Sequence, residues 1–192
     1  IPYVINSLTG LGSFYIQKSL KTTLLRVLIE KLNFFAFKIA KKVLFQNQDD
    51  LNLYVQKGLV PREKTILIKG SGIDTALFSP FSQDEIQQTR KNLKIPQDKI
   101  IILMVARAIL HKGIKEYYQA AKIITQQNPK ILFLYIGGID NGNIAPITQD
   151  FLESNPQVHY LGEKDNIKEW IGICDIFVLP SYRVGLPRTL LE

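Results

Sequence analysis

The sequence predicts an α/β fold with a parallel, doubly wound sheet, and three observations support this prediction. Short apolar segments that suit buried strands alternate with longer segments of helical periodicity along the chain. The 192 residues are 46% hydrophobic and 21% charged, which is the balance of an ordinary globular protein. Glycine follows several of the apolar segments, as expected where the backbone turns or approaches a ligand closely. Strands that alternate with helices are joined by right-handed crossovers, which produce a parallel sheet.

The predicted elements form two series, separated by a linker at residues 78–81. In the first series, strands are expected at residues 1–7, 42–46 and 64–69, with helices at residues 18–42 and 48–58. In the second series, strands are expected at residues 99–106, 130–136, 157–161 and 175–179. The helices of this series are expected at residues 82–93, 112–127, 144–154, 166–173 and 187–192. Ser82 and Glu85 have the spacing of a capping box, and Pro187 suits the first turn of the last helix.

The composition excludes several classes of protein. The longest apolar runs, residues 100–106 and 131–139, are far below the ~18 residues needed to span a bilayer. Cys174 is the only cysteine, so no intrachain disulfide can form and a reducing compartment is expected. No phosphate-binding Gly-Lys-Ser/Thr loop and no Gly-x-Ser-x-Gly motif is present. The chain begins without methionine and ends within a predicted helix, so we expect a fragment cut at both ends.

Most of the net charge of +7 lies in the predicted helix at residues 18–42, where Glu30 is the only acidic residue. Apolar side chains recur there at three- and four-residue steps, at Leu20, Leu24, Leu28, Leu32, Phe35 and Ile39. A basic amphipathic helix of this kind can lie on an anionic membrane surface. The pattern fits equally well a helix that packs in the fold and whose charges are only solvated. Nucleic acid is not an expected partner, because the basic residues alternate with leucines rather than with stacking aromatics.

A candidate anion site follows the predicted strand at residues 99–106. Arg107 comes directly after this strand, and Lys112 stands at the start of the next predicted helix. Two cations beside a helix N-terminus suit a diphosphate, although the spacing alone is more typical of two ordinary surface cations. Between them, His111 is expected to face solvent. The other histidine, His159, is expected to be structural, and Cys174 and Trp170 are expected to lie in the core. With one cysteine and two separated histidines, no metal site is expected.

The other predicted strands also end in loops of a type that can contact a ligand. These loops are Gly137-Gly138-Ile139-Asp140, Gly162-Glu163-Lys164-Asp165 and residues 180–187. Each of them taken alone is also a plain turn. In a parallel sheet the carboxyl ends of the strands meet at one edge, which is where ligands bind. The set of loops therefore favours a binding site at that edge.

Taken together, these segments resemble the retaining family 4 glycosyltransferases of GT-B fold, especially bacterial enzymes that build capsule, O-antigen or lipid-linked glycans. Residues 43–50 and 70–80 resemble the end of the family's N-terminal domain and its interdomain passage. Residues 105–113 resemble the donor-phosphate site, and residues 137–140 and 158–162 resemble the next strand ends. Residues 179–188, together with Glu192, resemble the acidic motif of the family.

The resemblance implies two domains and a sugar-transfer reaction. Residues 1–69 would be a remnant of the acceptor-binding N-terminal domain, and residues 70–192 a nucleotide-sugar-binding C-terminal domain that is truncated at its end. The implied reaction transfers a sugar with retention from a nucleotide-sugar, expected to be a UDP-sugar, to a glycan or lipid-linked acceptor, with no other cofactor. A lipid-linked acceptor would place the protein at the cytoplasmic face of the membrane.

The resemblance also implies a role for each site residue. Arg107 and Lys112 would hold the diphosphate and offset the charge of the leaving group. Glu192 would accept hydrogen bonds from the ribose, and the turn that contains Glu163 would border the base. The backbone amides of Gly185 and Leu186 would face the sugar or the phosphate. The loop that contains Gly12 would reach the reaction centre from the first domain.

One position departs from the family pattern. The acidic motif has a glutamate eight residues before the position of Glu192, and this chain has Val184 there. A valine cannot accept hydrogen bonds from the donor sugar, so we expect the fragment to be inactive or nearly so. Two alternatives follow, namely an inactive nucleotide-sugar-binding remnant and a peripheral membrane module built on residues 18–42.

Overall fold

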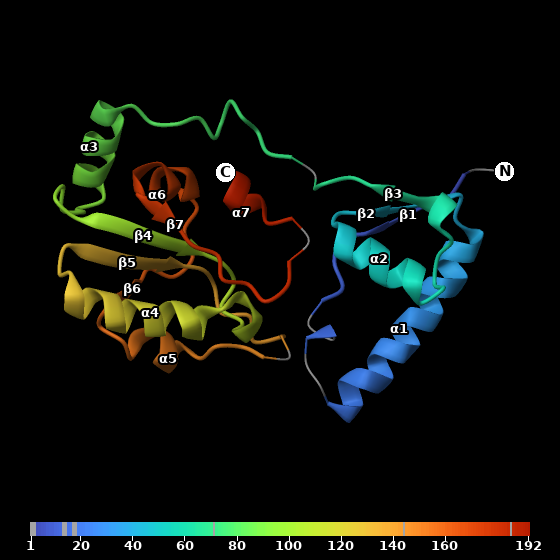
Figure 1. Cartoon of the computed structure of the whole chain (residues 1–192). Coiled ribbons are helices and arrows are strands. Elements are labelled where there is room, and N and C mark those ends of the chain that lie inside the picture. Colours follow the sequence, from blue (N-terminus) through green and yellow to red (C-terminus); the bar gives the residue numbers. More distant parts are fainter. Residues whose placement is uncertain (1–2, 13–14, 17–18, 71, 144, 185) are drawn as a thin grey trace. The chain divides into compact units, whose positions relative to one another are not determined.

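The computed structural model describes residues 3–12, 15–16, 19–70, 72–143, 145–184 and 186–192 (Figure 1). The chain divides into two compact units. Unit 1 contains Ile1–Gly72 and Arg183–Arg188, and unit 2 contains Ile73–Tyr182 and Thr189–Glu192. Among the described residues, no helix has both the length and the hydropathy that crossing a bilayer requires.

Unit 1 is built on a parallel sheet with the strand order β1-β2-β3. Its strands are β1 (Ile5–Leu8), β2 (Lys42–Phe45) and β3 (Thr65–Leu67), and its helices are α1 (Leu20–Ile39) and α2 (Gln48–Gln56), with a 3-10 turn, η2 (Arg62–Lys64), before β3. The core centres on three aromatic rings, because Phe37 of α1, Phe45 of β2 and Tyr54 of α2 contact one another.

Helix α1 is fixed by polar contacts at both ends. Ser19 is its N-cap and forms a capping box with Thr22, which satisfies amide groups that have no partner within the helix. At the other end, the Lys64 ammonium donates to the carbonyl oxygens of Phe37, Lys38 and Ala40, at 3.3, 2.9 and 2.9 Å. A cation at the carboxyl end of a helix also complements the helix dipole.

Unit 2 is built on a second parallel sheet, with the strand order β6-β5-β4-β7. Its strands are β4 (Ile100–Val105), β5 (Ile131–Ile136), β6 (Val158–Tyr160) and β7 (Ile176–Phe177). Its helical elements are α3 (Gln83–Asn92), the 3-10 turn η3 (Leu110–Lys112), α4 (Ile114–Gln127), α5 (Gln149–Glu153) and α6 (Ile167–Ile173). The short helix α7 (Arg188–Leu191) runs from the last residue of unit 1 into unit 2.

Helices cover both faces of the unit 2 sheet, with α4 and α5 on one face and α3 and α6 on the other (Figure 1). Along β4, Ile102 and Met104 join the core that contains α4, whereas Ile101 and Leu103 join the core that contains α6. Because side chains alternate between the faces of a strand, a strand buried on both faces is apolar throughout. The doubly wound parallel sheet predicted from the sequence is confirmed in this unit.

Several predicted elements have other bounds in the structure; the strands expected at residues 64–69 and 175–179, for example, are only β3 and β7. The first strand begins at Ile5 rather than at residue 1. The helix expected at residues 144–154 is only α5, because residues 145–147 bond to the loop after β4 instead: Ala145 O accepts from Leu110 N–H and Ile147 N–H donates to Ala108 O. Lys112 lies in η3, so α4 begins two positions later than predicted, at Ile114. The two units divide after Gly72, and Arg183–Arg188 also belong to unit 1.

Candidate functional site

The carboxyl edge of the unit 2 sheet is formed by loops that are hydrogen-bonded to one another. After β4 and β5, the chain continues the parallel pairing as Ala108 N–H donates to Gly138 O at 2.8 Å. Leu110 N–H donates to Ala145 O at 2.9 Å, and Ile147 N–H donates to Ala108 O at 2.8 Å. The loop that follows β4 and the loop that follows β5 therefore form one frame at the edge where parallel sheets bind ligands.

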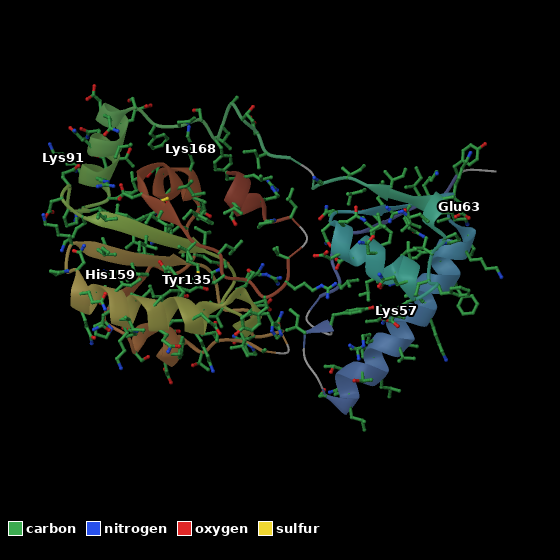
Figure 2. The ribbon with its side chains drawn as sticks, in the orientation of Figure 1. Lys57, Glu63, Lys91, Tyr135, His159 and Lys168 are labelled. Atoms are coloured by element: carbon green, nitrogen blue, oxygen red, sulfur yellow. The ribbon has the colours of Figure 1, made fainter. Side chains whose placement is uncertain are left out.

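Two glycines let these loops approach closely. A Cβ atom on Gly137 would lie 1.7 Å from the carbonyl oxygen of Ala106. A Cβ atom on Gly138 would lie 2.3 Å from a carboxylate oxygen of Glu163. Tyr135 and His159, labelled in Figure 2, lie on the neighbouring strands β5 and β6 that lead to this edge. The Glu163 side chain, predicted to border the base, thus lies directly against the Gly138 backbone.

Arg107 and Lys112 are close enough to influence each other. Burial, and to a smaller extent the charge of Arg107, lowers the pKa of the Lys112 ammonium below its ordinary value. The Arg107 guanidinium is exposed and pairs with Asp140, with 2.7 Å between Nη1 and Oδ2. Helix α4 begins next to Lys112 with Gly113 as its N-cap and without a side-chain cap. Two cations and uncapped helix amides form a surface that can bind an anion with more than one negative charge.

The loop after β7 packs on the loop that carries Lys112. Tyr182 N–H donates to His111 O at 3.0 Å, and the Tyr182 hydroxyl is hydrogen-bonded to the Glu116 carboxylate. Gly113 has φ +76°, and a Cβ atom there would lie 2.2 Å from Pro180 O. A larger residue at position 113 would collide with Pro180, so Gly113 lets the Lys112 loop approach residues 180–182 closely.

The structure corrects the predictions for both histidines. His111, expected to face solvent, is only 6% exposed, and neither ring nitrogen has a hydrogen-bond partner among the described residues. Its backbone carbonyl accepts from Tyr182 N–H in the loop after β7. His159, expected to be structural, is exposed on β6, the edge strand of the sheet.

Trp170 and Cys174 were both predicted to lie in the core. Trp170 is buried there, and Cys174 is partly buried against the same cluster. Burial raises the pKa of the Cys174 thiol to about 11, so this thiol is protonated and unreactive at neutral pH. Within the part of the chain that is described, no group of three or more His, Cys, Asp or Glu residues could hold a metal ion.

The remaining predicted site residues lie in several places. Glu192 lines a pocket with Phe78 and Pro80 of the linker and with Lys168 of α6. Gly12 and Leu186 belong to unit 1, where the Leu186 side chain packs on Gly70. Gly185 lies outside the described residues. The roles of Glu192, Gly12, Gly185 and Leu186 therefore stay predictions.

The sequence analysis missed two acidic residues with cationic partners. Asp140 was noted only as part of a strand-end loop, and its contact with Arg107 gives it a place beside the anion site. Asp50 of α2 is buried in unit 1 and is paired with Arg183 and hydrogen-bonded to Asn47. An acid that follows a glycine pair at a strand end could have indicated Asp140, whereas no local pattern links Asp50 to Arg183.

Comparison with known proteins identifies similar sequences over the whole chain. The family model of glycosyl transferases group 1 matches residues 85–192. The chain is 40% identical, over its whole length and 50% of the relative, to N,N'-diacetylbacillosaminyl-diphospho-undecaprenol alpha-1,3-N-acetylgalactosaminyltransferase of Campylobacter jejuni. It is 24% identical, over its whole length and 49% of the relative, to UDP-Gal:alpha-D-GlcNAc-diphosphoundecaprenol alpha-1,3-galactosyltransferase of Escherichia coli. The chain thus spans about half the length of these relatives.

Solved structures show a similar fold. Anabaena HepE in complex with UDP and glucose aligns with a TM-score of 0.68 and 20% identity, over 93% of this chain and 46% of HepE. WaaG, a glycosyltransferase involved in lipopolysaccharide biosynthesis, aligns with a TM-score of 0.69 and 15% identity, over 97% of this chain and 52% of WaaG. These similarities confirm the predicted α/β, Rossmann-like GT-B fold.

Proposed function

The chain belongs to the glycosyl transferases group 1 family, and from this premise we propose that unit 2 binds a nucleotide-sugar by its diphosphate. The whole protein then transfers the sugar, with retention, to a lipid-linked or polysaccharide acceptor in bacterial surface glycan synthesis. The observation that carries the proposal is that the loop after β4, which is hydrogen-bonded to the loop after β5, holds both Arg107 and Lys112 at the carboxyl edge of the sheet. The Campylobacter and Escherichia relatives, named for diphospho-undecaprenol substrates, support the acceptor class.

In this proposal Arg107 and Lys112 stabilise the diphosphate leaving group. The diphosphate gains negative charge as the bond to the sugar breaks, and the fixed charges of Arg107 and Lys112 stabilise it. Stabilisation of developing charge is usually the largest contribution to the rate. We propose that Glu192 accepts hydrogen bonds from the ribose and that Glu163 borders the base. The proposed donor is a UDP-sugar, bound without a metal ion, and the HepE complex with UDP supports this choice of nucleotide.

Calorimetry with UDP, GDP and ADP tests the donor site. We expect UDP to bind most tightly, and Arg107→Ala or Lys112→Ala to weaken binding about tenfold or more, since a charge-assisted hydrogen bond contributes about 1.5–3 kcal/mol. Lys115→Ala is the matched control, because this exposed lysine lies next to the site in the sequence but on the surface of α4. If Lys115→Ala weakens UDP binding as much as Lys112→Ala does, binding is non-specific and the proposed site is wrong.

Val184 bears on turnover rather than on binding. The Val184 side chain is exposed and offers no hydrogen-bond acceptor to a donor sugar. We expect this chain to bind UDP but to hydrolyse a UDP-sugar slowly, and Val184→Glu to raise the hydrolysis rate about tenfold or more, because orientation of the reacting groups strongly affects rate. Nucleotide binding with no hydrolysis by either form would favour the alternative function, a non-catalytic nucleotide-sugar-binding protein.

We also propose that α1 attaches the protein to the cytoplasmic face of the membrane. The apolar stripe predicted for this helix is exposed, with exposed fractions of 54–92% at Leu20, Leu24, Leu28, Leu32, Phe35 and Ile39. Lys21 and Lys31 line a groove with leucines of this stripe. The only acid in the helix, Glu30, is paired with Lys57 and turned toward the protein. An apolar helix face that is bordered by positive charges suits the surface of an anionic bilayer.

Sedimentation with lipid vesicles tests this attachment. We expect binding to vesicles that contain phosphatidylglycerol and little binding to phosphatidylcholine vesicles, with losses of about tenfold for the pair Leu24→Asn and Leu28→Asn. The pair Lys21→Gln and Lys31→Gln should reduce binding only to the anionic vesicles. Ile123→Asn, which changes an exposed apolar residue on α4, is the control. Equal binding to both kinds of vesicle would contradict the proposal.

A further inference from the structure

Arg107 is held at the candidate anion site by one contact from a neighbouring loop. Its Nη1 atom lies 2.7 Å from Oδ2 of Asp140, and the two side chains are 65% and 26% exposed. An exposed arginine has many rotamers, and those that point away from a ligand reduce its affinity. The ion pair with Asp140 restricts this freedom before any ligand binds.

Asp140 can restrict Arg107 because Asp140 is itself fixed. The Asn143 main-chain N–H donates to Asp140 O at 3.1 Å, and the Ala145 N–H donates to the side-chain oxygen of Asn143 at 3.3 Å. The Asn143 amide also lies 3.5 Å from Asp140 Oδ2, the atom that accepts from Arg107. This turn belongs to the frame of loops described above, so the carboxylate is held by the same backbone that positions Arg107.

The contact leaves most of the guanidinium available. An arginine side chain carries five N–H donors in a planar fork, and the ion pair with Asp140 uses the Nη1 end. Lys112, the second cation, is close enough for the Arg107 charge to lower its pKa. The negative charge of Asp140, paired with Arg107, offsets part of the repulsion between the two cations.

We propose that Asp140 is a positioning residue that orients the Arg107 guanidinium for the diphosphate. This inference rests on the proposed function, because it assigns a role in the same donor site. The competing possibility is that the carboxylate repels the diphosphate and competes with it for Arg107. The two possibilities differ in the sign of the effect when Asp140 is replaced.

Two substitutions at position 140 separate orientation from charge. Asp140→Ala removes both the acceptor and the charge, whereas Asp140→Asn keeps an oxygen that can accept from Arg107. By calorimetry with UDP, we expect Asp140→Ala to raise the Kd about three- to tenfold and Asp140→Asn to raise it about twofold or less. Asp98→Ala is the control, because Asp98 is an exposed acid that precedes β4 and so lies at the opposite edge of the sheet. Tighter UDP binding by both Asp140 variants would overturn the proposal and establish competition.

A second background shows whether Asp140 acts through Arg107. In an Arg107→Ala protein we expect Asp140→Ala to change the residual UDP affinity less than twofold, because the group that Asp140 orients is gone. An undiminished effect in that background would overturn the proposal, as would unchanged UDP binding by Asp140→Ala alone. Failure of the unsubstituted chain to bind UDP would overturn the proposed donor site itself and this inference with it. Thermal unfolding of Asp140→Ala, expected to match the unsubstituted chain, excludes a folding defect as the cause of weaker binding.

Discussion

The His111 imidazole makes the stability of unit 2 depend on pH. Burial lowers its pKa, so in the folded protein it resists protonation, whereas in the unfolded chain it titrates near its ordinary value of about 6.5. Below that pH the unfolded state binds more protons than the folded state does. Stability is therefore lost as the pH falls from about 6.5 toward the lower folded pKa, by at most about 1.4 kcal/mol per pH unit.

Substitution of His111 tests this linkage. We expect His111→Gln to lose less unfolding free energy than the unsubstituted chain when the pH is lowered below about 6.5. The measurement is denaturant unfolding followed by the fluorescence of Trp170, the only tryptophan, which lies in the same unit. His159→Gln is the control because this histidine is exposed, and it should follow the unsubstituted chain. Identical pH dependence for His111→Gln would show that the His111 imidazole is not a source of the acid sensitivity.

The turn between η3 and α4 depends on Gly113 for two separate reasons. Its φ of +76° is unfavourable for other residues, and a Cβ atom would collide with the backbone of Pro180. Gly162 has a similar φ of +70° in the same unit, and a Cβ atom there would have no neighbour within 4 Å. Comparison of the two positions therefore separates the conformational cost from the cost of the collision.

We expect Gly113→Ala to destabilise unit 2 clearly more than Gly162→Ala does. The conformational cost common to both is about 1 kcal/mol, and the collision at Gly113 adds to it because backbone atoms must move. Gly113→Ala should also weaken UDP binding, since the shift displaces the loop that carries Lys112. Thermal unfolding and calorimetry with UDP give the two readouts. Equal destabilisation by the two substitutions would mean that the Lys112 loop moves away from Pro180 without cost.

Elements with a strong periodic signal could be predicted from the sequence, and contacts between distant segments could not. The apolar run of β4 and the stripe of α1 are local patterns, and the bounds predicted for both elements lie within three residues of those observed. Helix α5 was predicted too long, because backbone bonds between Ala145 and Leu110 and between Ile147 and Ala108 override the local preference. The sequence shows that Arg107 and Lys112 follow the same strand, but it does not show that His111 O accepts from Tyr182 N–H, in a loop about seventy residues later in the chain.

The two units have separate hydrophobic cores. Unit 1 contains the cluster that includes Phe37, Phe45 and Tyr54, and unit 2 contains the clusters on the two faces of its sheet. A unit with its own core can unfold as its own cooperative transition, so two-state behaviour is not expected for the whole chain. Trp170 reports on unit 2 alone, whereas circular dichroism reports on the helices of both units.

This separation gives a prediction for thermal unfolding. We expect Phe45→Ala, which removes a fully buried ring at a cost of about 3–5 kcal/mol, to lower one transition seen by circular dichroism and to leave the Trp170 transition unchanged. UDP at about 100 times its Kd should do the reverse, stabilising unit 2 by about 2.7 kcal/mol and raising the Trp170 transition. If Phe45→Ala lowers the Trp170 transition by the same amount, the two cores unfold as one cooperative unit. A shift of the Trp170 transition by UDP that disappears in Arg107→Ala would link the stability of unit 2 directly to its proposed donor site.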